Sequence, residues 1–141
     1  MSAAAPADSV AATFKSLAPV LIVEDVGAGV TFWRDRLGFT VENEVPAPNG
    51  NFIFASAKRG NVEVMYQSRE SVLSEDPSSE KSLNGHSVVL FIDVGDIKSL
   101  DAVEQALDGA PVVKPRHETF YGMTEIYVRE PGGNVVGFAA R

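Results

Sequence analysis

The sequence has no cysteine in its 141 residues. This absence excludes disulfide bonds and thiolate metal ligands, and it favours a cytoplasmic location, because structural disulfides are typical of secreted proteins. No run approaches the roughly 18 apolar residues that a membrane-spanning helix needs, so we expect no membrane partner. Residues 1–16 contain no basic segment followed by an apolar core, and they are predicted to form a disordered extension rather than a signal peptide.

Positive charge is also scarce. The chain has 12 Lys and Arg against 19 Asp and Glu, which gives a net charge of −7. An acidic surface repels phosphate backbones, so we expect no nucleic-acid partner. The same charge attracts cationic small molecules and also serves solubility. Hydrophobic residues make up 45% of the chain, which is typical of one ordinary globular domain.

The chain contains the same pattern twice. Residues 17–67 predict a strand, a helix that begins after Asp25 and ends at Gly38, and three further strands. Residues 86–141 repeat this order, and a shift of 71 places Asp25 on Asp96 and Gly38 on Gly109. The segment 68–85 is polar and without periodicity, which indicates a linker. We therefore expect one domain, residues 17–141, of two βαβββ modules.

The last strands are joined by a tight turn, Pro131-Gly132-Gly133-Asn134. Pro fixes φ at the first corner, and Gly and Asn tolerate positive φ. Together with two segments of the first module, this turn resembles the vicinal oxygen chelate superfamily, which includes glyoxalase I, bleomycin-resistance proteins and extradiol dioxygenases. The matching segments are PVLIVEDV (19–26), FWRDRLGF (32–39) and EPGGN (130–134). The resemblance implies an α+β fold in which two tandem βαβββ modules form a curled mixed sheet around a cavity, in a homodimer.

The resemblance also implies where a metal would bind. Metal enzymes of the superfamily carry four His, Gln or Glu ligands, and the corresponding positions here are Ala18, Glu63, Val89 and Gly137. Three of these residues have no donor atom, and a single carboxylate holds Zn²⁺, Ni²⁺ or Fe²⁺ weakly. We therefore expect no cofactor. One divalent metal ion is the alternative, with Glu63 and His86 as weak candidate ligands.

Three side chains are candidates for catalysis: Glu63, His117 and Glu125. The last two are symmetric about Tyr121, so a hairpin centred there would place them opposite each other. Such a pair could orient a substrate or exchange a proton, although a solvent-exposed cross-strand pair is the preferred interpretation.

The facing implied by the family predicts a largely apolar cavity with a few polar groups, the usual design of a small-molecule site. The predicted ligand-binding residues are Val20, Ile22, Glu63, Met65, Gln67, Val89, Phe91, Phe120 and Tyr121. These residues could instead pack on one another or across a dimer interface. The sequence thus predicts a metal-free protein that binds a small organic molecule, with a metal-dependent lyase, isomerase or dioxygenase as the alternative.

Overall fold

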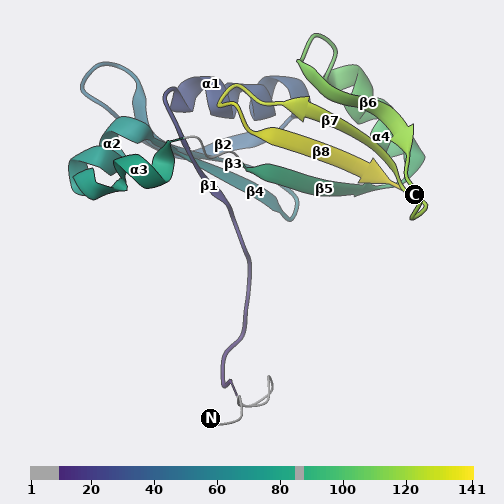
Figure 1. Cartoon of the computed structure of the whole chain (residues 1–141), viewed down its shortest axis with the longest axis horizontal. Helices are drawn as coiled ribbons and strands as arrows, with labels where there is room; N and C mark the ends of the chain where they lie inside the picture. The colour runs from purple at the N-terminus through teal and green to yellow at the C-terminus, as the bar shows by residue number, and fades with distance from the viewer. Residues whose placement is uncertain (1–9, 85–87) are drawn as a thin grey trace.

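The computed structural model describes residues 10–84 and 88–141, and it has two four-stranded sheets (Figure 1). The first sheet has the order β1-β4-β3-β2 and the second β5-β8-β7-β6, with the first and last strands of each module parallel. The remaining pairs are antiparallel. This topology confirms the predicted α+β fold of two βαβββ modules. The strands are β1 (Val20–Val23), β2 (Thr40–Pro46), β3 (Phe52–Arg59), β4 (Val62–Ser68), β5 (Val89–Gly95), β6 (Val112–Glu118), β7 (Thr124–Arg129) and β8 (Val135–Ala140).

One helix of each module follows its first strand. These helices are α1 (Val26–Thr31), which continues into the π-helical turn η2 (Phe32–Arg36), and α4 (Ile97–Ala106). The side chain of Asp25 accepts a hydrogen bond from the Ala28 N–H, and Asp96 accepts one from the Ser99 N–H. Both aspartates are therefore the N-caps that the repeat predicts. The π-helical turn was not predicted.

The predicted linker contains short helices. They are α2 (Arg69–Glu75), η3 (Pro77–Ser79) and α3 (Glu80–Leu83), and none of them has a buried residue. Local caps explain the first two: Ser68 accepts from the Ser71 N–H and Asp76 from the Ser78 N–H. Such caps act without an apolar stripe, so the lack of periodicity concealed them. Residues 10–16 run away from the two sheets as an extended segment (Figure 1).

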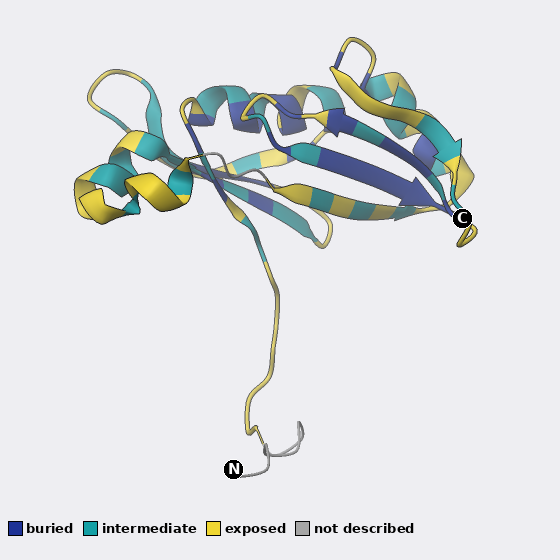
Figure 2. Ribbon diagram, in the orientation of Figure 1, coloured by how far each residue is buried: buried dark blue, intermediate teal, exposed yellow. Residues whose placement is uncertain are grey.

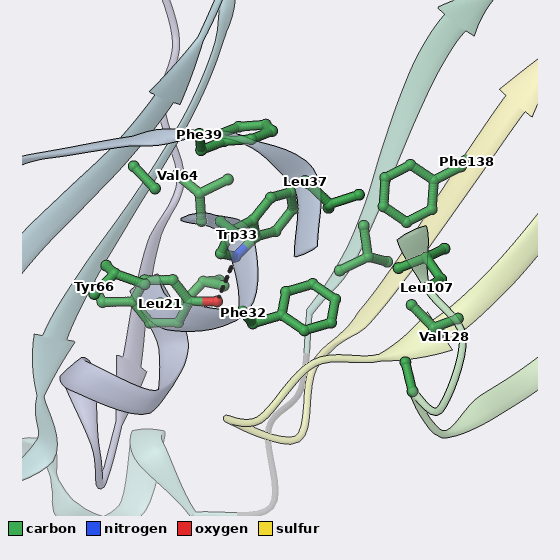
Figure 3. Close-up of a cluster of buried hydrophobic side chains, with 14 of the residues drawn as sticks. Leu21, Phe32, Trp33, Leu37, Phe39, Val64, Tyr66, Leu107, Val128 and Phe138 are labelled. Carbon is green, nitrogen blue, oxygen red and sulfur yellow. Dashed lines mark hydrogen bonds between the residues drawn. The ribbon is translucent and has the colours of Figure 1, made fainter. Parts of the chain in front are cut away.

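The helix of each module packs on its own sheet, α1 against β3 and β4, and α4 against β5 and β8. Figure 2 shows buried residues in α1 and along β8. Leu21 and Val64 point to the helix side in the first sheet, and Val128 and Phe138 do so in the second. The buried side chains of both modules form one hydrophobic cluster. Figure 3 shows the Leu37 side chain between the first module and Phe138 of the second. The two modules therefore share a core. Within residues 10–84 and 88–141, no helix is long and apolar enough to cross a membrane.

A chain of buried hydrogen bonds also joins the modules. The Trp33 indole N–H donates to the Tyr66 hydroxyl at 2.9 Å (Figure 3). This hydroxyl donates to Glu130 at 2.8 Å. Glu130 also accepts from the Gly132 N–H and from the backbone and side-chain nitrogens of Asn134. Burial, reinforced by the Glu130 charge, raises the pKa of Tyr66. Glu130 thus fixes the β7–β8 turn and ties it to the first module.

Candidate ligand-binding face

The second face of each sheet points away from the helices, and we call the two faces together the open face. In the first sheet it carries the residues that alternate with the core residues of each strand. Val20 lies opposite Met65, and Ile22 lies opposite Gln67. Glu63 lies on the same side of β4 as these two partners, because Val62, Val64 and Tyr66 take the other side. The structure therefore brings together five of the predicted ligand-binding residues.

In the second sheet the open face has small residues at its centre. Val89 lies opposite Val135, and Phe91 lies opposite Gly137. The side chains of Val89 and Phe91 therefore lie on the same face of the sheet as these two residues of β8. Val89 is 64% exposed and Phe91 is 53% exposed. These two predicted residues therefore form an apolar strip that lies open in the single chain.

A cavity lies at the boundary between the two sheets, and residues of both faces line it. It has a volume of about 300 Å³ and lies between the start of β4 and the middle of β5. Glu63 and Phe91 both line it, together with Leu17, Pro19 and Asp93. The predicted carboxylate and the predicted aromatic residue thus come from different modules and meet at one site.

The strongest polar feature of the open face is the buried carboxylate of Glu125, which is 2% exposed. The Tyr121 hydroxyl donates to Glu125 Oε2 at 2.6 Å, and the Tyr127 hydroxyl donates to Oε1 at 2.9 Å. These bonds compensate part of the cost of burying the charge. We call Glu125, Tyr121, Tyr127 and His117 the carboxylate–tyrosine cluster.

The carboxylate–tyrosine cluster depends on the glycine at position 137. A Cβ at Gly137 would lie 2.2 Å from the Tyr127 ring, so the ring lies directly over this residue. Burial first, and then the hydrogen bond to Glu125, raise the pKa of Tyr127 to about 12. The hydrogen bond to Glu125 is the main reason that the pKa of Tyr121 is raised. Both phenols therefore remain protonated donors at neutral pH.

His117 lies directly opposite Glu125 across β6 and β7, as the symmetry about Tyr121 predicts. Its Nε2 is 3.9 Å from Glu125 Oε1, and its ring stacks on Tyr127 with the centroids 6.2 Å apart. Its Nδ1 lies 2.8 Å from the Pro115 carbonyl oxygen. The preferred interpretation of a solvent-exposed pair is wrong for Glu125, because the two tyrosines cover its carboxylate.

The other two predicted residues lie at the tip of the β6–β7 hairpin. Phe120 is fully exposed, and its ring makes an edge contact with Tyr121 at 5.1 Å. Only Tyr121 reaches back to the cluster. Tyr127 was missing from the predicted site, although its alternation with Ile126 and Val128 placed it on this face.

At three of the four positions where the resemblance places metal ligands, the side chain has no donor atom; the fourth is Glu63. Ala18 and Val89 have no donor atom, and neither has Val135, the cross-strand partner of Val89. The Tyr127 ring fills the space over Gly137. Among the residues that the structure describes, no group of three or more His, Asp or Glu side chains could hold a metal ion. The weak candidate His86 lies outside the described residues.

The fold and the open face define a two-module protein of the glyoxalase class, and comparison with known proteins gives the family. Residues 13–138 match the model of the Glyoxalase/Bleomycin resistance protein/Dioxygenase superfamily, and the chain belongs to this family. A comparison with curated proteins finds no significant match.

Several solved structures share this fold. A lactoylglutathione lyase from Agrobacterium tumefaciens is 19% identical, with a TM-score of 0.68, 89% of this chain covered and 92% of that chain. A glyoxalase/bleomycin resistance protein/dioxygenase family enzyme from Burkholderia phytofirmans PsJN is 21% identical, with a TM-score of 0.70 and coverages of 87% and 95%. TioX from Micromonospora sp. ML1 is 21% identical, with a TM-score of 0.68 and coverages of 90% and 98%. At these identities the likeness shows the fold alone.

Proposed function

We propose that this protein binds a small organic molecule on the open face without the help of a divalent metal ion. This proposal rests on Gly137, which stands at a position where the resemblance places a metal ligand. Where the family's metal enzymes have a ligand, this chain has a glycine covered by Tyr127, whose hydroxyl donates to Glu125. The alternative, a lyase, isomerase or dioxygenase that uses a metal ion, needs donor atoms that Ala18, Val89 and Gly137 lack.

The charge and aromatic rings of the cluster support a cationic ligand. A carboxylate attracts a cation, and an aromatic ring such as that of the exposed Tyr121 stabilises an ammonium group. Phe91 lies opposite Gly137, so it adds an apolar wall next to the Tyr127 ring. The net charge of −7 increases the local concentration of cations. The expected ligand therefore has an apolar body and a positively charged group.

We expect benzyltrimethylammonium to bind in calorimetric titrations, and benzoate, which has the opposite charge, to bind the open face much more weakly. Glu125→Gln should weaken the binding of the cation at least about tenfold, a loss near 1.4 kcal/mol, because the amide has no net charge. Glu75→Gln is the matched control, because Glu75 is exposed at the end of α2. Equal affinity of wild type and Glu125→Gln for the cation would contradict the proposed site.

We also propose that two copies associate through the open face in the cytoplasm. Val20, Val89 and Phe91 are all more than 40% exposed there, and exposed apolar strips of this kind are commonly paired. Light scattering at micromolar concentration should give twice the 15.1 kDa mass of the chain. Phe91→Asp should shift the protein toward the monomer. A wild-type protein that is monomeric at that concentration would refute the dimer.

A further inference from the structure

A second cavity adjoins the first and extends to the side of the sheets where the helices are; Val62, Ile92 and Asp93 line both cavities. It has a volume of about 590 Å³ and lies between the two modules, with α4 along one wall. This volume is in the range of small-molecule pockets. We call it the helix-side cleft. Its apolar lining includes Leu37, Phe39 and Val62 of the first module and Ile92, Val103 and Phe138 of the second.

Two arginines of the first module, Arg36 and Arg59, line the same cleft. Arg36 Nη1 donates to the Asp108 carbonyl at 2.5 Å, and Arg59 Nη1 donates to the Leu37 carbonyl at 2.6 Å. Each guanidinium has five N–H donors, so each retains donors for a ligand. In the part of the chain that the structure describes, neither arginine forms a salt bridge.

This arrangement is unusual for an acidic protein. The chain has only 12 basic residues, and two of them border one apolar cleft without a carboxylate partner among the described residues. Asp93 also lines the cleft, but it lies opposite Ala139 on the open-face side of β5, where its carboxylate accepts a hydrogen bond from the Gly95 N–H at 2.8 Å. Arginine pairs with carboxylates through two parallel hydrogen bonds, and it is the residue best suited to such pairs.

We propose that the helix-side cleft binds a small carboxylate with an apolar body, such as a medium-chain or aromatic carboxylic acid. The acid group would pair with Arg36 and Arg59, and the body would cover the apolar lining between the modules. No residue of the carboxylate–tyrosine cluster lines this cleft, and the cleft would take a ligand of opposite charge. Its failure would therefore leave the proposed function untouched.

The single tryptophan provides the measurement. Trp33 is buried, and its ring packs at 5.0 Å from the ring of Phe39, which lines the cleft. Bromine quenches tryptophan fluorescence at short range. We expect a terminally brominated undecanoate to quench Trp33 in a saturable titration, and the corresponding brominated alcohol, which has no charge, to bind at least about tenfold more weakly. An excess of benzyltrimethylammonium should not displace the acid.

Two variants test whether the acid binds in the helix-side cleft. The double variant Arg36→Gln/Arg59→Gln should bind the acid at least about tenfold more weakly than the wild type does. Its affinity for the alcohol should be unchanged. Ala102→Leu should lower the affinity for both the acid and the alcohol, because Ala102 lines the cleft and the larger side chain occupies part of it. Ala102 is exposed, so this change leaves the core undisturbed. This second variant keeps the test valid if the arginine variant melts at a lower temperature. Equal quenching by acid and alcohol, or acid affinity unchanged in both folded variants, would overturn the proposal.

Discussion

Glu130→Ala is expected to lower the free energy of unfolding by about 3–5 kcal/mol, the usual cost of removing one partner from a buried, charged network. Glu130 is 1% exposed and accepts four hydrogen bonds, from Tyr66, Gly132 and two nitrogens of Asn134. Alanine leaves these donors without an acceptor. Because Tyr66 belongs to the first module and Asn134 to the second, the loss weakens the contact between them. Denaturant unfolding measures this change.

Glu130→Gln and Glu118→Ala are the matched controls for this result. Glutamine keeps the size and one acceptor oxygen, so about 1–3 kcal/mol of loss is expected. Glu118 is exposed at the end of β6, and its replacement by alanine should change the stability by less than about 0.5 kcal/mol. If Glu130→Ala costs no more than Glu118→Ala, then Glu130 does not join the modules as described.

Gly137→Ala is expected to cost about 2 kcal/mol, because it adds a methyl group where the Tyr127 ring lies. The ring must move, and its hydroxyl then loses the 2.9 Å hydrogen bond to Glu125. The pKa of Tyr127 should fall from about 12 toward its ordinary value in a spectrophotometric titration. Unfolding and titration thus report the same displacement independently.

A double-mutant cycle tests whether the cost comes from the ring. In the Tyr127→Ala background, Gly137→Ala should have little effect, so the two changes should be coupled by about 1 kcal/mol or more. Gly27→Ala is the control, because its added Cβ would lie 3.4 Å from the Asp25 carboxylate, an ordinary contact, and alanine favours the helix. Additive effects of the changes at positions 127 and 137 would show that the ring does not cover Gly137.

The architecture could be predicted because its determinants are local and occur twice. Asp25 and Asp96 cap equivalent helices, and Gly38 and Gly109 have φ of 71° and 84°, where glycine is favoured. Alternation along β4 placed Glu63, Met65 and Gln67 on one face. These features depend on residues close in the sequence, so the sequence alone was sufficient to predict them.

The arrangement of the site could be predicted only in part, because it depends on contacts across strands. The pairing of His117 with Glu125 follows from hairpin symmetry, but the burial of Glu125 follows from two tyrosine hydroxyls that meet it in space. In the sequence, Glu130 appeared only as the first residue of the segment EPGGN, which carries part of the family resemblance. Its buried bond to Tyr66 joins residues 64 positions apart, and no local pattern indicates such a contact.

The content of divalent metal in the folded protein tests the central proposal most directly. The measurement is elemental analysis of protein purified without added chelator, together with the melting temperature before and after treatment with EDTA. A bound ion stabilises a fold by mass action, so its removal would lower the melting temperature. Since Ala18, Val89 and Gly137 have no side-chain donors, we expect well below one Zn, Ni, Fe or Mn per chain and an unchanged melting temperature. About one ion per chain, with a marked drop after EDTA, would contradict a metal-free binding protein.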